Sequence, residues 1–263
     1  WTLEEYIETA RKMAEWGKSQ GIYGTYTHTY ANEWATVAAQ KGQWYTPDNQ
    51  CNIKDPAWRT ALETRKMLDD EGTQMPYGQI VAVKAVINSS FLGGKEAMVN
   101  AGSWLVRDMK NRDKFPFDFQ VGVACLPRFD ETVEGPCSNY SCSVLGIPEN
   151  SKHKEEAWRF IRYYVEECSD YIAASGNLPT YLPAYSDEMI HIFCEGSGLD
   201  EEYGKKFFDS SIKLTTNKII GPCGAQYMQI GKEEIEQYFN GEKTLEETLD
   251  NIERRVNEEL AKQ

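Results

Sequence analysis

The stretch 91–104, FLGGKEAMVNAGSW, holds the residue types best suited to binding chemistry in this chain. Its glycine pair 93–94 supplies the left-handed backbone that ends a helix, and the apolar run 97–99 has the length of a strand buried on both faces. Gly102 permits a ligand to approach the backbone, and the ring of Trp104 offers a flat face on which the CH face of a sugar can stack. The alternative is a core tryptophan beside a turn.

The sequence does not match the motifs of two other kinds of functional site. A phosphate-binding loop around Gly93-Gly94 fails, because Ser89 stands at the position of its first glycine and Glu96 at the position of its Ser or Thr. The Gly196–Gly198 stretch lacks the spacing of a nucleophile elbow. A pair of carboxylates for glycoside hydrolysis stays open among 41 acidic residues, because such a pair is defined in space and not in sequence.

Composition limits the partners. The formal charge is −13, from 41 acidic and 28 basic residues, so neither a nucleic acid nor an anionic membrane surface is an expected partner. A neutral ligand fits better. No run approaches the roughly 18 apolar residues of a membrane span, and no signal peptide opens the chain. We expect no direct membrane span.

Cysteine and histidine give no metal or cofactor pattern. The three histidines lie far apart, and the seven cysteines include no C-x-x-C, so we expect neither a metal site nor a cofactor. Cys137 and Cys142 flank a polar loop and could close a small disulfide. Half-buried free thiols are the alternative that we favour.

Helical spacing dominates the chain, with a few short extended segments between the helices. Capping boxes at Thr2 and Thr244 open the first and last helices, and an Asp55-Pro56 start opens a helix with Trp58 on its buried face. The patterns predict helices over 2–17, 30–40, 55–72, 104–111, 201–212 and 225–239, within 77–91, after 148–151 and from 244, and strands over 21–27, 97–99, 117–126 and 141–147. The fold class is therefore α/β, a mixed sheet of about four or five short strands flanked by many helices.

The stretch 91–104 resembles the signature F-x-x-G-K-x-A-M-x-x-x-G-x-W of the extracellular (family 1) solute-binding proteins that serve carbohydrate ABC importers. The matching residues are Phe91, Gly94, Lys95, Ala97, Met98, Gly102 and Trp104. Segments near residues 1–5, 55–62, 121–130 and 146–161 are similar to further family segments in the family's order.

The resemblance implies a fold and a division of the chain. It implies the C-terminal lobe of a type II periplasmic-binding-protein fold, maltose-binding-protein-like, in a fragment that lacks most of the N-terminal lobe. Residues 1–144 and 191–263 would belong to the C-terminal lobe, and 145–190 would normally complete the N-terminal lobe and hinge. The helix of 145–190 would then have little to pack on in this chain.

The resemblance also implies a ligand site and a role. The protein would bind a carbohydrate, with an oligosaccharide expected, between two lobes and deliver it to permease subunits; it would be no enzyme and a monomer. We expect an extracellular or periplasmic protein, anchored as a lipoprotein through a missing N-terminal segment. A secreted carbohydrate-active enzyme, or its sugar-binding accessory module, is the alternative function. The expected ligand contacts are Trp104, Gly102, Ser103, Tyr30, Asn32, Trp34, Trp44, Asn177, Tyr181 and Tyr227, and a core role for Trp34 is the alternative there.

Overall fold

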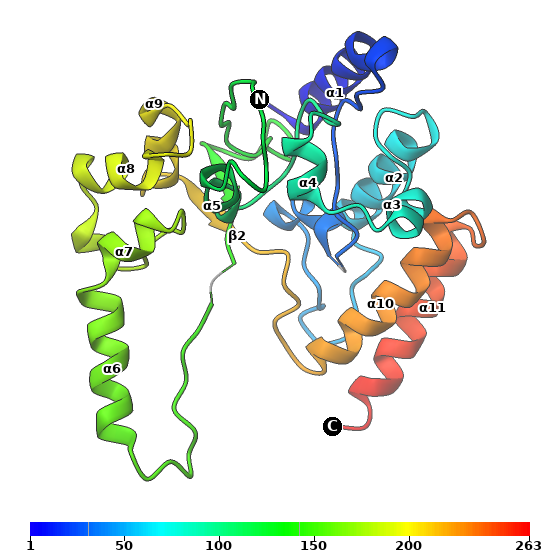
Figure 1. Cartoon of the computed structure of the whole chain (residues 1–263). Coiled ribbons are helices and arrows are strands. Elements are labelled where there is room, and N and C mark those ends of the chain that lie inside the picture. Colours follow the sequence, from blue (N-terminus) through cyan, green and yellow to red (C-terminus); the bar gives the residue numbers. More distant parts are fainter. Residues whose placement is uncertain (31, 142) are drawn as a thin grey trace. The chain divides into compact units, whose positions relative to one another are not determined.

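The computed structural model describes residues 1–30, 32–141 and 143–263 (Figure 1). The chain forms two compact units, each assembled from separate stretches of sequence. Unit 1 comprises residues 1–100, 126–140 and 213–263, and unit 2 comprises residues 101–125 and 141–212.

Unit 1 is mainly helical, and its helix ends follow local sequence signals. In the first helix the Thr2 hydroxyl accepts a hydrogen bond from the Glu5 amide, while the Glu5 carboxylate accepts one from the Thr2 amide at 2.8 Å. The same reciprocal pair at Thr244 and Glu247 opens the last helix. Both predicted capping boxes are confirmed. The helices of unit 1 are α1 Leu3–Gly17, α2 Pro56–Asp70, α3 Tyr77–Val83, α4 Ile87–Leu92, α10 Gly224–Phe239 and α11 Leu245–Leu260.

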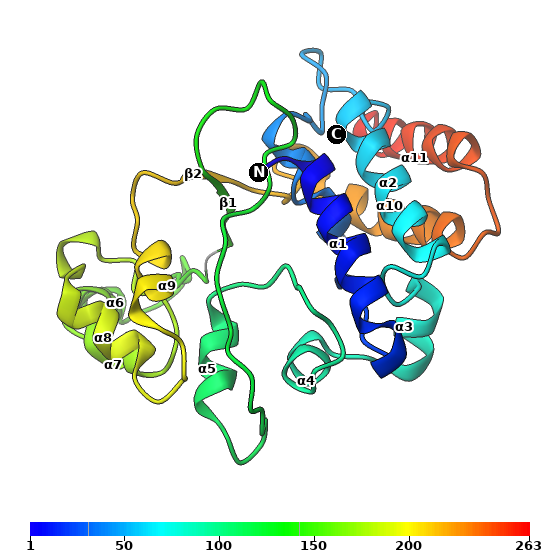
Figure 2. The same ribbon diagram turned by 90° about the horizontal axis from the view of Figure 1, so that it is seen from above.

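The core of unit 1 lies between α2, α10 and α11. The long helices α10 and α11 run side by side (Figure 2), and their apolar faces meet that of α2. Asp55 caps α2 with Pro56 in the first turn, and Trp58 is fully buried, as predicted. Apolar side chains from all three helices form one continuous cluster, so burial of that shared face stabilises the unit.

The extended segments of unit 1 pair only briefly. Strand β1, Cys137–Asn139, runs parallel to β2, Lys213–Thr215. The predicted strand 21–27 makes single parallel bridges instead, from Tyr23 to Glu96 and from Thr25 to Gln74. β1 and β2 are the only two strands in the described parts of the chain, fewer than the predicted four or five.

Four local predictions were wrong. The segment 97–99 forms no strand, and its residues are only partly buried. The segment 30–40 forms two short 3-10 turns, Glu33–Ala35 and Ala38–Gln40, and not a continuous helix. Residues 117–126 and the described part of 141–147 form no strand, because an alternating pattern makes a strand only where a neighbouring backbone offers the matching donors and acceptors.

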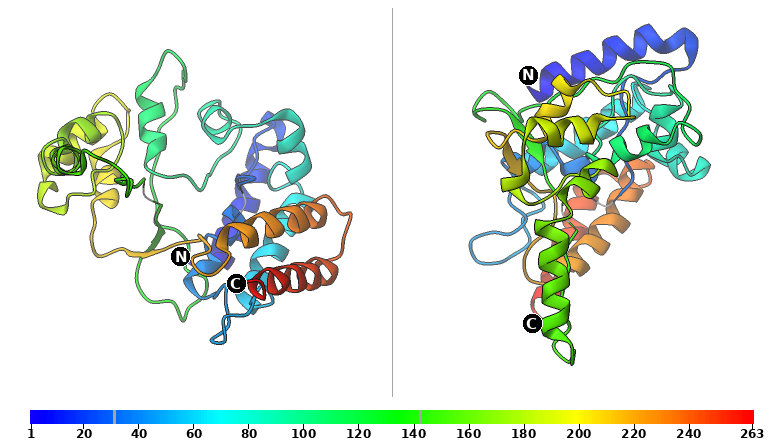
Figure 3. Two further views of the ribbon diagram at one scale, coloured as in Figure 1. Left: turned by 90° about the horizontal axis from the view of Figure 1, so that it is seen from below. Right: turned by 60° about the vertical axis from the view of Figure 1, so that its left-hand side comes forward.

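Unit 2 is a set of short helices and one longer, exposed helix. Figure 1 shows α6 extending away from α7 and α8 of the same unit, and Figure 3 repeats this from another side. No residue of α6 is buried, and Trp158 and Phe160 are 52% and 60% exposed. The helices are α5 Trp104–Lys110, α6 Lys154–Glu166, α7 Ser169–Ala174, α8 Asp187–Cys194 and α9 Glu201–Gly204, with 3-10 turns at Leu182–Ala184 and Lys205–Phe207. The predicted helix 201–212 is thus shorter.

Across the residues that the structure covers, we find no helix with both the length and the apolar character needed to cross a membrane.

Candidate functional site

The first half of stretch 91–104 forms the end of α4 and a tight turn in unit 1. Gly94 has a positive φ of 70°, and its amide donates to the Phe91 carbonyl at 2.9 Å. The Lys95 amide then donates to the Ser90 carbonyl at 3.1 Å, which closes the helix end. The predicted glycine turn is confirmed, and it delivers Glu96 to its bridge with Tyr23.

Glu96 is a buried carboxyl at this turn. Its Oε1 accepts a hydrogen bond from the Ser90 hydroxyl at 2.6 Å, and its Oε2 is buried without a partner among the described residues. Burial raises the pKa of Glu96 to about 7, against smaller lowering effects from Ser90 and the Lys95 charge. A carboxyl group with this pKa is largely neutral in the mildly acidic range. The Glu96 side chain contacts Ser90 of α4, while the backbone on either side of Glu96 pairs with Tyr23.

The second half of stretch 91–104 places Trp104 at the first turn of α5 in unit 2. Leu105, Val106 and Met109 anchor this helix by burial, while Trp104 itself stays partly exposed. A Cβ on Gly102 would lie 2.4 Å from the Trp104 Nε1. Only glycine therefore accommodates this position of the indole ring, and Ser103 joins the two residues.

Unit 2 also brings the turn 176–177 against α5. Gly176 has a φ of 78°, and a Cβ there would lie 2.4 Å from the backbone of Arg107, one turn along α5 from Trp104. The Asn177 amide side chain donates to the Ser175 hydroxyl at 2.9 Å. Tyr181 lies partly exposed a few residues on. Gly102, Ser103, Trp104 and Asn177 thus lie on or beside one short helix.

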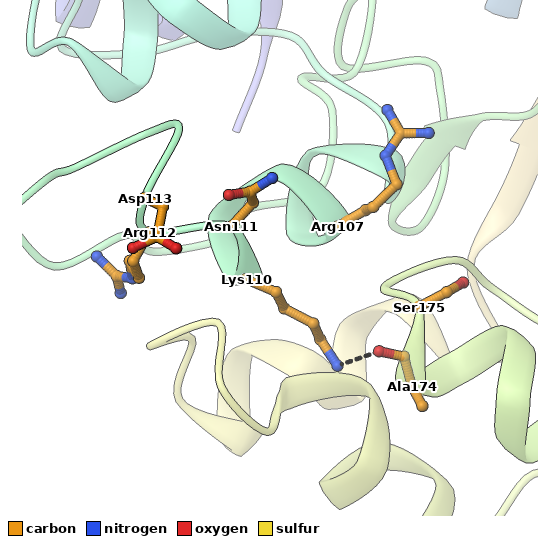
Figure 4. Close-up of a pocket in the computed structure, with 7 residues that line it drawn as sticks. All are labelled: Arg107, Lys110, Asn111, Arg112, Asp113, Ala174 and Ser175. Carbon is orange, nitrogen blue, oxygen red and sulfur yellow. Dashed lines mark hydrogen bonds between the residues drawn. The ribbon is translucent and has the colours of Figure 1, made fainter.

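A charged pocket opens at the other end of α5 (Figure 4). Lys110 Nζ donates to the carbonyl oxygens of Ala174 and Ile192 at 2.9 and 3.0 Å, so it caps the end of α7. Arg112 donates to the carbonyl oxygens of Phe117 and Ser197. Because the side chains of Lys110 and Arg112 already donate to backbone carbonyls, we assign the pocket a structural role. None of the predicted ligand contacts lines it. It is lined by Arg107, Lys110, Asn111, Arg112, Asp113, Ala174 and Ser175.

Three of the predicted contacts in unit 1 lie in an aromatic cluster. Trp44 stacks on Trp58 with ring centroids 4.0 Å apart, and Trp34 meets both rings edge-on. Tyr227 is 1% exposed and accepts a hydrogen bond from the Cys51 thiol at 3.1 Å; burial raises the pKa of its hydroxyl. Trp34 is 8% exposed and Trp44 is partly buried, so this cluster serves the core of unit 1.

Tyr30 and Asn32 lie in different surroundings from that cluster. Tyr30 is 67% exposed. Asn32 exchanges two hydrogen bonds with Asn217, each 3.1 Å long, between side-chain amides and backbone carbonyls. The side chain of Asn32 is thus occupied by hydrogen bonds to a residue 185 positions away in the sequence. Tyr30 is therefore the predicted contact of unit 1 that is most accessible to a ligand.

The structure reveals supporting residues that sequence patterns did not indicate. His28 stacks on Tyr30, Arg65 binds the backbone before Tyr30, and Asn217 holds Asn32. The sequence held one signal by which a supporting residue could have been found: Arg65 is a charged residue on the predicted buried face of the 55–72 helix.

Cysteines and metal-binding groups add nothing further to this site. The Cys137 thiol is free and buried, and it donates weakly to the Gly135 carbonyl. Cys142, with which Cys137 could close a disulfide, lies outside the described residues. Within the described residues, no three His, Cys, Asp or Glu side chains are grouped to hold a metal ion.

Comparison with known proteins identifies a family. The sequence family described as "Bacterial extracellular solute-binding protein" matches residues 1–189. No curated protein matches the chain in sequence.

Solved structures resemble the chain over almost its whole length. One is a sugar transporter protein from Rhizobium etli in an open conformation (TM-score 0.72, 17% identity, 97% of this chain and 64% of that one). Others are an ABC substrate-binding protein from Listeria monocytogenes in complex with cycloalternan (0.69, 18%, 99% and 64%) and a sugar-binding protein from Xanthomonas citri (0.69, 18%, 98% and 63%). These likenesses show the fold, the type II periplasmic-binding-protein fold, and the chain spans less than two thirds of each of those proteins.

Proposed function

The chain belongs to the family of bacterial extracellular solute-binding proteins, and from this premise we propose that it is part of the carbohydrate-binding component of an ABC importer. The observation that carries the proposal is the family match over residues 1–189, which includes the whole stretch 91–104. Among the proteins of the same fold, the one from Xanthomonas citri is described as a sugar-binding protein, and the one from Listeria monocytogenes is an ABC substrate-binding protein in complex with cycloalternan.

The proposed contacts in unit 2 combine one stacking ring with polar groups of the same unit. Trp104 supports this role best, because Gly102 leaves its indole room and α5 holds it at a partly exposed position. Asn177 and Tyr181 are the further contacts that we favour in unit 2, and Tyr30 is the contact that we favour in unit 1. Trp34, Trp44, Tyr227 and Asn32 stay predictions, and their packing favours a supporting role.

The proposed role in transport follows from the family description. The ligand would be a neutral carbohydrate, with an oligosaccharide expected, held by aromatic stacking and hydrogen bonds and released to membrane permease subunits. The family consists of binding proteins and not of enzymes, and its extracellular designation implies a location outside the cytoplasmic membrane. Anchoring as a lipoprotein and a monomeric state stay predictions.

A ligand screen on the complete protein tests the proposal. We expect maltose or a larger oligosaccharide to raise the melting temperature in a concentration-dependent manner, because a ligand that binds only the folded state stabilises it by mass action. Differential scanning fluorimetry measures this shift, with sodium chloride at matched osmolarity as the control. No shift with any mono- or oligosaccharide would contradict the proposal, and release of chromophore from nitrophenyl glycosides would favour the enzyme instead.

We further propose that segment 145–190 helps to form a second lobe whose remainder lies outside this chain. The support is a group of large aromatic side chains exposed on α6, since a folded protein seldom leaves many such side chains of one helix open to water. They are Trp158, Phe160, Tyr163 and Tyr164, spread around the helix and all at least 42% exposed.

Hydroxyl-radical footprinting can test this assignment. In the complete protein we expect Trp158 to be oxidised more slowly than in the chain 1–263, because the second lobe would cover it. Trp16, 61% exposed on α1, is the control and should react equally in both proteins. Equal oxidation of Trp158 in both would refute the assignment.

A further inference from the structure

The exposed Tyr30 ring is stacked on a histidine. The centroids of the His28 and Tyr30 rings lie 3.5 Å apart with the planes 19° from parallel, and the Tyr30 amide donates to His28 Nδ1 at 3.1 Å. An Nδ1 that accepts a hydrogen bond carries no proton. His28 therefore has to be neutral, with its proton on Nε2, for this arrangement to exist.

A buried arginine holds the backbone that carries this pair. Arg65 on α2 is 3% exposed. Its Nη1 donates to the Thr27 carbonyl at 2.8 Å and lies 3.5 Å from the His28 carbonyl. Two consecutive carbonyls just before Tyr30 thus face one guanidinium group.

The guanidinium group is itself fixed from several sides. Its Nε donates to Asp69 Oδ1 at 3.0 Å, and Asp69 also accepts from the Gln74 side chain at 2.7 Å and from the Tyr77 amide at 3.1 Å. The Gln74 Oε1 accepts from the Thr27 hydroxyl at 3.0 Å. The support under the segment 27–30 is therefore a network of buried polar groups centred on Arg65, in which Arg65 Nη2 is buried without a hydrogen-bond partner among the described residues. The remaining hydrogen bonds of the network restrict its geometry.

We propose that Arg65 is a positioning residue for the ligand site: it fixes the segment 27–30 and keeps His28 in the neutral form that stacks with Tyr30. This inference rests on the proposed function only in that Tyr30 is taken as a ligand contact. It assigns a supporting role in the site to Arg65 and His28, which act through the proposed ligand contact Tyr30.

The charges around His28 support this role. Burial first and the Arg65 charge second lower the pKa of His28 to about 4. The other titratable groups facing it are Tyr26, which packs edge-on at 6.1 Å, Tyr30, and Asp69 behind Arg65. A cationic imidazole would repel Arg65 and lose its Nδ1 acceptor, so protonation would release the stack.

Nitrogen-15 NMR of the histidine rings in the chain 1–263 tests the proposal. The chain has three histidines, His28, His153 and His191, so assignment by single substitutions is simple. In the wild type we expect His28 to show the Nε2-protonated neutral tautomer without change from about pH 8 to pH 5. His191 should titrate above its ordinary value, because its bond to Glu201 raises its pKa, and it serves as the internal control.

Substitution of Arg65 should move the His28 titration. In Arg65→Met the neighbouring cation is lost and the Asp69 carboxylate stays, so the His28 midpoint should rise by up to about one pH unit, because burial, the larger cause of the lowered pKa, remains. In Arg65→Lys the positive charge stays and the planar fork is lost, so the midpoint should stay low. Tryptophan fluorescence, to which the buried Trp58 of unit 1 contributes, would verify that each variant is folded. The unmoved midpoint of His191, which lies in unit 2, would show that the change is confined to unit 1.

Three results would overturn the positioning role: a wild-type His28 that titrates near pH 6.5, an Nδ1-protonated tautomer, or a folded Arg65→Met with an unchanged His28 midpoint. The wild-type measurement decides even if Arg65→Met fails to fold. Because these spectra involve no ligand, they are independent of the carbohydrate screen. Absence of sugar binding would contradict the proposed function alone, and a normally titrating His28 would contradict the positioning role alone.

Discussion

Replacing Trp104 by alanine in the complete protein is expected to weaken carbohydrate binding by roughly thirty-fold, about 2 kcal/mol. The reason is the loss of the flat apolar face on which a sugar would stack, at a position where α5 and Gly102 already hold the ring. Isothermal titration calorimetry with the sugar found by the ligand screen measures the effect. Far-UV circular dichroism should be unchanged, because alanine is a good helix former at the first turn of α5.

Two matched variants separate stacking from general damage. Trp104→Phe keeps an aromatic face and should retain most of the affinity, whereas Gly102→Ala should weaken binding, because its Cβ would lie 2.4 Å from the Trp104 Nε1 and displace the ring. Trp16→Ala, at an exposed site on α1, should leave binding unaltered. Full affinity in Trp104→Ala would remove this residue from the site and leave the family assignment standing.

Replacing Trp58 by alanine is expected to destabilise unit 1 by about 3–5 kcal/mol. Trp58 is completely buried, stacks on Trp44 at 4.0 Å and donates from its Nε1 to the Gln43 carbonyl at 3.1 Å. A Cβ on Gly42 would lie 2.7 Å from the same ring, so the surrounding backbone is shaped to the indole. Truncation would leave a cavity in this cluster, while the Gln43 carbonyl would keep its hydrogen bond from the Asn52 side chain at 3.0 Å.

Urea denaturation followed by far-UV circular dichroism measures this loss of stability. Trp16→Ala is again the matched control. Because Trp16 is 61% exposed, its replacement should change the free energy of unfolding by no more than about 0.5 kcal/mol. A Trp58→Ala variant with the same transition midpoint as Trp16→Ala would show that the aromatic cluster does not hold unit 1 together.

The expected ligand contacts included three tryptophans, Trp34, Trp44 and Trp104, whose environments in the structure differ. The structure buries Trp34 and packs Trp44 on Trp58, but leaves Trp104 partly exposed beside a glycine. Burial is a sum over neighbours from distant segments, so spacing within one segment does not determine it.

Features set by a few adjacent residues could be predicted from the sequence alone. The capping boxes at Thr2 and Thr244, the Asp55-Pro56 helix start and the Gly94 turn all form as expected, because each involves hydrogen bonds or backbone angles within about four residues. The ordered motif around Trp104 was specific enough to indicate the family. The exposure of α6 was also expected, because the resemblance implied that the helix of 145–190 has little to pack on in this chain.

Features that need two distant segments were decided by the tertiary structure. The strand patterns at 117–126 and in the described part of 141–147 form no strand, and within them only Leu126 is bridged, to Cys137. The segment 21–27 pairs at single bridges only. Asn32 binds Asn217, and Arg65 binds the carbonyl of Thr27, across intervals of 185 and 38 residues. Local sequence sets the conformations that a segment prefers, whereas hydrogen-bond partners, burial and the charge that His28 experiences depend on which segments folding brings together.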